Sequence, residues 1–106
     1  MEESGSRSGN GVPPKAPPEQ MSQAIIQYPA HYTFKIIGLA SDDFAEYATS
    51  LVTRVAGPVP PDKVAMRTSS QGKYHSISVV AYLTSEEQRR AIYQCLWEDK
   101  RVVYYL

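Results

Sequence analysis

The stretch that most constrains the fold is TSSQGKYHSISVVAYLT, residues 68–84. Residues 74–83 alternate strictly, so a strand built from them presents two different faces. One face carries Tyr74, Ser76, Ser78, Val80 and Tyr82, and the other carries His75, Ile77, Val79, Ala81 and Leu83. The second face is the more apolar one, which predicts a sheet with one covered face and one partly exposed face.

The polar segment 69–73, SSQGK, joins this strand to KVAMRTS, residues 63–69, which also alternates. Glycine with small polar neighbours suits a hairpin turn of about four or five residues, with Gly72 at the turn. The segment can also be interpreted as a nest of backbone amides that holds an anion beside Lys73. We favour the hairpin, because the segment lacks the spacing of a P-loop and joins two strands.

The first half of the domain contains a strand and a helix. HYTFKIIG, residues 31–38, alternates as a strand with several β-favouring residues. Residues 41–57 predict a helix with Ser41 as its N-cap and Gly57 as its C-cap. One helical stripe carries the apolar residues Phe44, Ala48, Leu51, Val52 and Val55. PVPPD, residues 58–62, predicts a loop, because proline lacks the backbone donor that a helix or a ladder requires.

The second half ends with another helix and a short strand. TSEE, residues 84–87, predicts a capping box between Thr84 and Glu87. The last strand is RVVYYL, residues 101–106. We expect the helix between them to bury Ala91, Ile92, Cys95 and Leu96 and to expose Glu86, Arg89 and Arg90.

The resulting order is β-α-β-β-α-β, the split pattern of ferredoxin-like domains. The fold class is therefore α+β: a sandwich of a four-stranded antiparallel sheet with two helices on one face. Strands 31–38 and 74–83 are expected at the centre of the sheet, with 63–69 and 101–106 at its edges. The predicted core contains Phe34, Ile36, Val64, Met66, Ile77, Val79 and Leu83.

Residues 1–27 differ from the rest in composition. They contain four prolines and three of the six glycines, with few apolar residues. Such a segment cannot offset the entropy lost on ordering, so we interpret it as a flexible Pro/Gly/Ser-rich tail whose last part can lie against the domain as a turn of helix. Residues 28–106 are predicted to form a single ferredoxin-like domain.

Composition argues against several classes of function. Eleven basic and eleven acidic residues balance, so no basic excess favours nucleic acid or an anionic membrane. Cys95 is the only cysteine, which excludes an intramolecular disulfide and a cysteine-based zinc cage. No apolar run approaches the length of about 20 residues that a membrane span needs. We expect a cytoplasmic protein.

Candidate catalytic groups are few. His31 and His75, the only histidines, each begin a strand, and neighbouring strands could bring them together. Two histidines need a third ligand to hold zinc, and no carboxylate is spaced for that role. No nucleophile stands beside a general base. The sequence therefore predicts no enzyme, no metal and no cofactor.

The other face of the sheet suggests an alternative. The open face consists of the face of strand 74–83 that begins at Tyr74 and of residues from the neighbouring strands. These residues are Thr33, Lys35, Ile37, Ala65 and Arg67. RNA-recognition motifs share this topology and stack bases on aromatic side chains of the two central strands. KYHSISVV does not match their motif, and the first strand supplies Lys35 and Ile37 where an aromatic residue is needed. An RNA-binding module on the open face stays as the alternative function.

Three stretches resemble the YbeD-like family of small bacterial proteins. They are YPAHYTFKIIG, SSQGKYHSISV with serine, glycine, tyrosine and serine at alternate positions 70–76, and the short strand at the end. The similarity covers residues 28–106. It implies a ferredoxin-like fold related to ACT domains, which sense amino acids, and members are labelled as regulators connected with lipoate metabolism. No catalytic residue is implied, and fold does not fix function.

The ACT-like relationship implies a ligand site at the turn from the first strand into the first helix: Gly38, Leu39, Ala40 and Ser41. Asp42 and Asp43 follow in the first turn of the helix and supply negative charge there. A small zwitterion or a cationic group therefore fits this turn better than a bare anion. We predict a non-enzymatic regulatory or interaction domain that binds a small metabolite or a protein partner. A weak homodimer, or a partner strand along an exposed edge, is expected as well.

Overall fold

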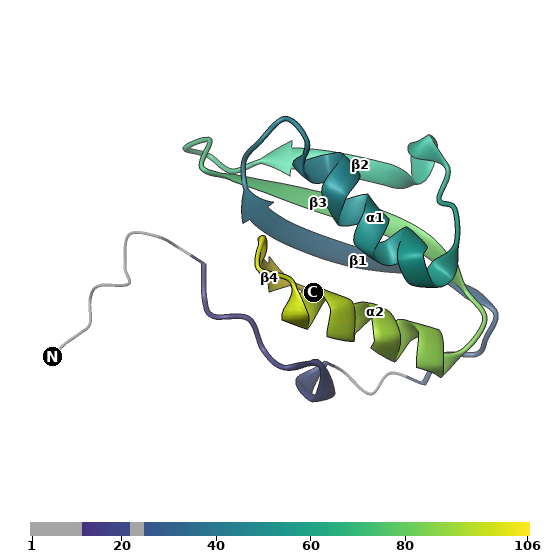
Figure 1. The fold of residues 1–106 in the computed structure, drawn as a ribbon. Helices are drawn as coiled ribbons and strands as arrows, with labels where there is room; N and C mark the ends of the chain where they lie inside the picture. Colours follow the sequence, from purple (N-terminus) through teal and green to yellow (C-terminus); the bar gives the residue numbers. More distant parts are fainter. Residues whose placement is uncertain (1–11, 22–24) are drawn as a thin grey trace, which may run out of the picture.

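The computed structural model describes residues 12–21 and 25–106 (Figure 1). The predicted order of strands and helices is confirmed. The elements are β1 (Ala30–Leu39), α1 (Phe44–Ala56), β2 (Val64–Thr68), β3 (Tyr74–Leu83), α2 (Glu86–Glu98) and β4 (Val102–Tyr105). Two short 3-10 helices, η2 (Pro18–Gln20) and η3 (Pro61–Lys63), precede β1 and β2.

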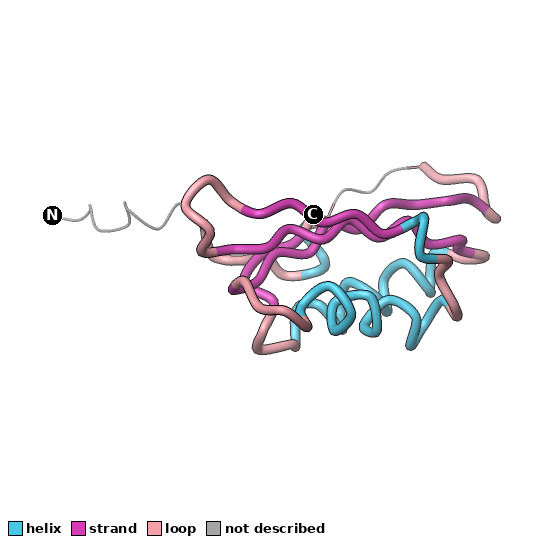
Figure 2. The backbone as a smooth tube through the Cα atoms, turned by 90° about the horizontal axis from the view of Figure 1, so that it is seen from above, coloured by secondary structure: helices cyan, strands magenta, loops and turns pink. Residues whose placement is uncertain are grey.

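The four strands form one antiparallel sheet in the order β2-β3-β1-β4. The predicted central and edge strands are therefore confirmed. Both α-helices lie on the same side of this sheet (Figure 2). The ferredoxin-like α+β architecture is thus as predicted, and neither α-helix covers the opposite face of the sheet.

The core lies between the sheet and the two α-helices. It forms because alternate residues of β1 and β3 point toward the apolar stripes of the helices. Its fully buried side chains include Phe34, Ile36, Phe44, Leu51, Ile77, Leu83, Ile92 and Leu96. Met66 was predicted in the core but is 51% exposed, and Val64 is only half-buried. Both belong to the edge strand β2, which has a neighbouring strand on one side only.

Both helix starts differ from prediction. Asp43, not Ser41, is the N-cap of α1, and its side chain makes no capping hydrogen bond. The predicted C-cap Gly57 is confirmed, with φ at 87° and its amide bonded to the Thr53 carbonyl at 2.9 Å.

The capping box of α2 lies one residue later than predicted. Ser85 is the N-cap and accepts from the Gln88 amide at 3.2 Å, while the Gln88 side chain accepts from the Thr84 amide at 2.7 Å. The box fails at Thr84 because α2 begins at Glu86, which moves every cap position by one residue.

The buried face of α2 was also predicted incorrectly in part. Arg89 was placed on the exposed face but is only 3% exposed, whereas Ala91 is exposed and Cys95 is half-buried. Tyr93 is buried in the core, and Arg89, one helical turn earlier, lies on the same inward face of α2.

The predicted tail lies only partly within the described residues, since 1–11 and 22–24 fall outside them. Part of segment 12–21 lies against α2, and at the end of that helix the Lys15 ammonium donates to the carbonyls of Leu96 at 2.9 Å and Asp99 at 2.8 Å. A cation on the last carbonyls of a helix satisfies groups that have no partner within the helix. The division between tail and domain stays a prediction.

Candidate functional site

A hollow of about 530 Å³ opens on the face of the sheet that the α-helices leave uncovered. It lies over one end of β1, β2 and β3, at the turn between β2 and β3. We call it the open-face hollow. Its lining residues are Val12, Lys35, Ile37, Arg67, Thr68, Ser69, Ser70, Gln71, Lys73, Tyr74 and Ser76.

The register of the sheet brings the strand residues of this hollow together. Ser76 on β3 pairs with Arg67 on β2 and with Ile37 on β1, so these three side chains form a row across the open face. Lys35 lies two residues before Ile37 and projects to the same face. A basic residue from an edge strand and another from a central strand therefore border one depression.

The turn between β2 and β3 forms the wall of the hollow and confirms the predicted hairpin. The Ser69 amide donates to the Tyr74 carbonyl, and the Gly72 amide donates to the Ser69 carbonyl, each at 2.9 Å. The Ser69 hydroxyl accepts from the Tyr74 amide at 3.0 Å. Gly72 has a φ of 77°, which glycine adopts without steric cost. The Lys73 carbonyl accepts from the Ala40 amide at 2.9 Å and ties the turn to the end of β1.

The charge around the hollow is of one sign. Lys35, Arg67 and Lys73 line it, and none of the lining residues that the structure describes is an aspartate or a glutamate. Within residues 12–21 and 25–106, none of the three takes part in an ion pair. Cations without a carboxylate partner leave a positive potential on the surface. The hollow is therefore suited to a negatively charged group.

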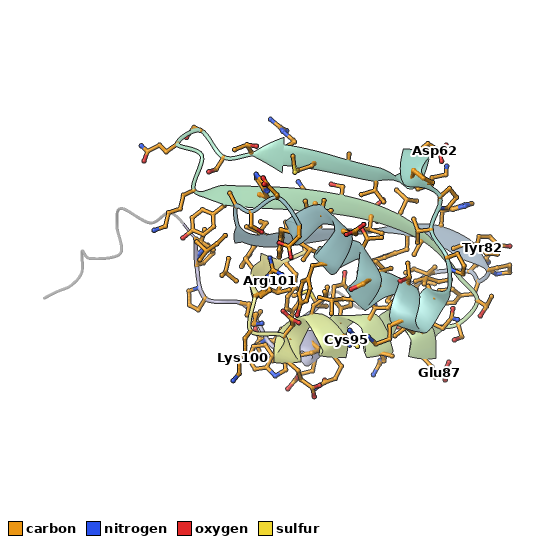
Figure 3. All side chains as sticks on the ribbon, turned by 45° about the horizontal axis from the view of Figure 1, so that its top comes forward. Asp62, Tyr82, Glu87, Cys95, Lys100 and Arg101 are labelled. Atoms are coloured by element: carbon orange, nitrogen blue, oxygen red, sulfur yellow. The ribbon has the colours of Figure 1, made fainter. Side chains whose placement is uncertain are left out.

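The predicted ligand turn, Gly38–Ser41, lies at the same end of the sheet but contacts a different cation. The Arg101 guanidinium donates to the Ser41 hydroxyl at 2.9 Å and to the Asp43 carboxylate at 2.9 Å. It also lies 4.3 Å from the centre of the Tyr47 ring. Arg101 is labelled beside α1 in Figure 3. A small ligand at this turn stays a prediction, and its positive group would have to displace Arg101.

The ion pair between Asp43 and Arg101 predicts a pH dependence of stability. Hydrogen bonds from Arg101 lower the pKa of Asp43 from 3.8 to about 2. Because the pKa is lower in the folded state, the pair stabilises the fold above pH 3.8 and its contribution is lost as pH falls toward 2. We expect Asp43→Asn to be less stable than the wild type at pH 6 and equally stable once the pH is below about 2.

Urea denaturation at a series of pH values measures this difference. In an Arg101→Gln background the Asp43→Asn substitution should have little effect at any pH, since the partner is gone. A difference between wild type and Asp43→Asn that does not change with pH would contradict the assignment.

The two histidines do not form a site together. His31 pairs with Tyr82, which is labelled at the far right of Figure 3, and His75 pairs with Gly38. Seven positions of β1, from 31 to 38, separate the two pairs, which is about 24 Å along a strand. The suggestion that neighbouring strands bring them close is therefore wrong. Within the described ranges, no group of three His, Cys, Asp or Glu residues could hold a metal ion.

Sequence reasoning found the parts of the hollow but not the hollow itself. The alternation of the strands places Lys35 and Arg67 on the open face, and the sequence places Lys73 in the turn. Their proximity depends on the strand register. The length of the turn between β2 and β3 could have indicated this register, because turn length in a hairpin fixes which residues pair. The contribution of Val12 comes from the N-terminal segment and had no signal in the pattern.

None of the helices in the described ranges is long and apolar enough to cross a membrane.

Comparison with known proteins places this chain among small bacterial proteins. The family described as "Protein of unknown function (DUF493)" matches residues 23–106. The UPF0250 protein RSc0326 of Ralstonia nicotianae is 35% identical over 83 residues, which is 78% of this chain and 82% of the relative. The UPF0250 protein IL0958 of Idiomarina loihiensis is 32% identical and covers 77% of this chain and 91% of its own.

One solved structure supports the fold. The solution structure of protein HP0495 from H. pylori matches with a TM-score of 0.63 at 22% identity. The match covers 84% of this chain and 93% of the other. At this identity the likeness extends to the fold alone.

Proposed function

We propose that this chain, which belongs to the DUF493 family of proteins of unknown function whose relatives carry the name UPF0250, is a small non-enzymatic regulatory or interaction domain. In this proposal it binds through the open face of its sheet. The YbeD-like resemblance found in the sequence agrees with this family. The cytoplasmic location expected from the sequence is part of the proposal.

The open-face hollow is the observation that carries this proposal. Its volume of about 530 Å³ lies within the range of roughly 300–1,000 Å³ that small-molecule sites occupy. Among the described residues, its lining offers cations, hydroxyls and a few apolar groups, but no carboxylate, histidine or cysteine that could activate a hydroxyl as a general base or act as a nucleophile itself. This chemistry favours recognition over reaction.

A thermal-shift screen tests the proposal with amino acids, lipoate-related acids, phosphorylated metabolites and short RNA at low salt. A ligand at about a hundred times its dissociation constant should stabilise the fold by about 2.7 kcal/mol. For a domain of this size that corresponds to a rise in Tm of about 10 °C or more. The rise should disappear in a Lys35→Gln/Arg67→Gln double variant and persist in Lys63→Gln, a matched control outside the hollow.

Two results would refute the proposal. One is a ligand whose stabilising effect survives the double variant, because binding would then lie elsewhere on the molecule. The other is chemical conversion of the ligand during incubation with the protein, detected by mass spectrometry. Conversion of the ligand would show that the protein is an enzyme.

An RNA-binding module is the second candidate. It is favoured by one arrangement, in which Tyr74 lines the hollow together with Lys35, Arg67 and Lys73, and the Lys73 ammonium lies 5.5 Å from the centre of the Tyr74 ring. Bases could stack on this ring while the cations bind the backbone. If the three cations replace counterions on single-stranded RNA, a plot of the logarithm of affinity against the logarithm of salt concentration should have a slope of about −2.

Pairing along a sheet edge is part of the same proposal. Among the described residues, β2 pairs with β3 alone and β4 pairs with β1 alone, so each has an unpaired outer edge. An unpaired strand edge can add a strand from a second copy or from a partner protein. Sedimentation velocity over a range of concentrations tests the homodimer, and a strict monomer at high concentration would exclude self-pairing.

A further inference from the structure

We propose that the open-face hollow binds the phosphate group of a small phosphomonoester. This inference rests on the proposed function and names the class of ligand that the hollow takes. It places the ligand on the open face, away from the Gly38–Ser41 turn where Arg101 already lies.

The number and origin of the cations favour phosphate over carboxylate. Arg67 comes from an edge strand, Lys35 from a central strand and Lys73 from the turn, so the three approach the hollow from different sides. A phosphomonoester carries close to two negative charges at neutral pH, against one for a carboxylate. Three cations that lack carboxylate partners in the described ranges match the more highly charged group.

The hydrogen-bond donors lead to the same choice. Hydroxyls of Thr68, Ser70 and Ser76 line the hollow and make no hydrogen bond within the part of the chain that the structure describes. Together with the planar guanidinium fork of Arg67, they can donate to several oxygens of one group. A phosphate offers three such acceptor oxygens, and a carboxylate offers two.

The wall of the hollow is already ordered. Ser69 closes the turn through its amide, carbonyl and hydroxyl, and the Lys73 carbonyl is held by the Ala40 amide. The backbone of the turn, which carries the Ser70 hydroxyl and the Lys73 ammonium, is therefore ordered before a ligand arrives. This order lowers the entropic cost of binding.

The remaining lining indicates a small ligand. Ile37, Val12 and the Tyr74 ring can contact a short apolar or aromatic part. A nucleic acid would need stacking platforms for successive bases, and β1 presents Ile37 at the position where a second aromatic would stand. The arrangement thus suits one anionic head with a modest apolar body.

Titration of the ¹⁵N-labelled full chain with phenyl phosphate tests the proposal by NMR. Phenol and benzoate are matched probes that share the ring but carry no charge or one charge. We expect phenyl phosphate to shift the amides of Ile37, Ser70 and Lys73, to bind about tenfold more tightly than benzoate, and to leave phenol without measurable binding. Affinity should fall several-fold between pH 7.5 and pH 5, because the second phosphate pKa is about 6.

Substitutions identify the cations involved. Arg67→Gln and Lys35→Gln should each weaken phenyl phosphate binding by about tenfold, the effect of losing one charge-assisted hydrogen bond. Lys63→Gln and Arg54→Gln are the control variants. Lys63 precedes β2 and lies outside the hollow, and Arg54 belongs to α1, which covers the opposite face of the sheet. Each should change affinity less than twofold. All four side chains are exposed, so the variants should fold normally, as circular dichroism can verify.

Three results would overturn the inference. Equal binding of phenol and phenyl phosphate would leave an open-face site that does not recognise phosphate, so the proposed function would survive without it. Equal weakening by Lys63→Gln and Arg67→Gln would show a diffuse electrostatic effect. Short RNA that binds the same face at least tenfold more tightly than any phosphomonoester, with the salt slope given above, would make the hollow a nucleic-acid site.

Discussion

Replacing Gly38 by alanine is expected to lower the free energy of unfolding by about 3 kcal/mol, the upper range for inserting one methyl group into a packed core. A Cβ atom at this position would lie 2.4 Å from Cζ of Phe44 and 2.7 Å from the backbone oxygen of Arg101. Phe44 is fully buried, so its ring cannot move aside into solvent. The Arg101 oxygen belongs to the chain that leads into β4, and it can move only with that strand.

The cause is space and not backbone conformation. Gly38 does not lie in the left-handed region, whereas Gly72 does, with a φ of 77° and no atom within 4 Å of an added Cβ. Gly72→Ala is therefore the matched control, and it should cost only about 1 kcal/mol from backbone strain. Urea denaturation of both variants gives the comparison.

A double variant tests the steric explanation directly. Phe44→Leu removes the far end of the ring that the new methyl group would strike. Gly38→Ala and Phe44→Leu together should cost less than the sum of their separate effects, by at least about 1 kcal/mol. Simple additivity, or a Gly38→Ala cost no greater than that of Gly72→Ala, would contradict the close packing described here.

Most of the fold could be predicted because it depends on local patterns. The alternation in 74–83 and the apolar stripe from Phe44 to Val55 each reflect the geometry of a single element. The order β-α-β-β-α-β then leaves few ways to arrange a sheet with two helices on one face. Errors arose at edges, as with Met66, and at helix starts, where neighbouring polar residues offer several plausible caps.

The candidate site depends largely on contacts between distant positions, and the local pattern of the hairpin turn fixes only the pairing of β2 with β3. Arg101 contacts Asp43 across 58 positions, so the cation at the predicted ligand turn could not be foreseen from residues 38–43. Lys35 and Arg67 could be assigned to a face by parity, but their approach to Lys73 required the register between strands. Parity gives the face of a residue, and register gives its neighbours.

Arg89 shows the same limit of prediction from local patterns within the core. Its substitution is the second change for which we expect a large loss of stability. Replacing Arg89 by methionine is expected to cost about 2 kcal/mol of stability, because it removes a charge-assisted hydrogen bond and two contacts of the guanidinium with aromatic rings. The guanidinium donates to the Glu86 carboxylate at 2.8 Å and lies 5.0 Å from the centre of the Tyr32 ring and 5.3 Å from that of Tyr93. Methionine keeps most of the buried side-chain volume, so the loss reports on the charge.

Arg90 supplies the matched control. It contacts the same Glu86 carboxylate at 3.3 Å, but its side chain is 74% exposed against 3% for Arg89. Exposed ion pairs contribute little, so Arg90→Met should cost less than about 0.5 kcal/mol in the same urea experiment. Equal costs for the two variants would mean that the pairing with Glu86, and not the burial between two rings, determines the effect. A clear difference would explain why an arginine occupies the inward face of α2, where the periodicity of the helix alone favours an apolar residue.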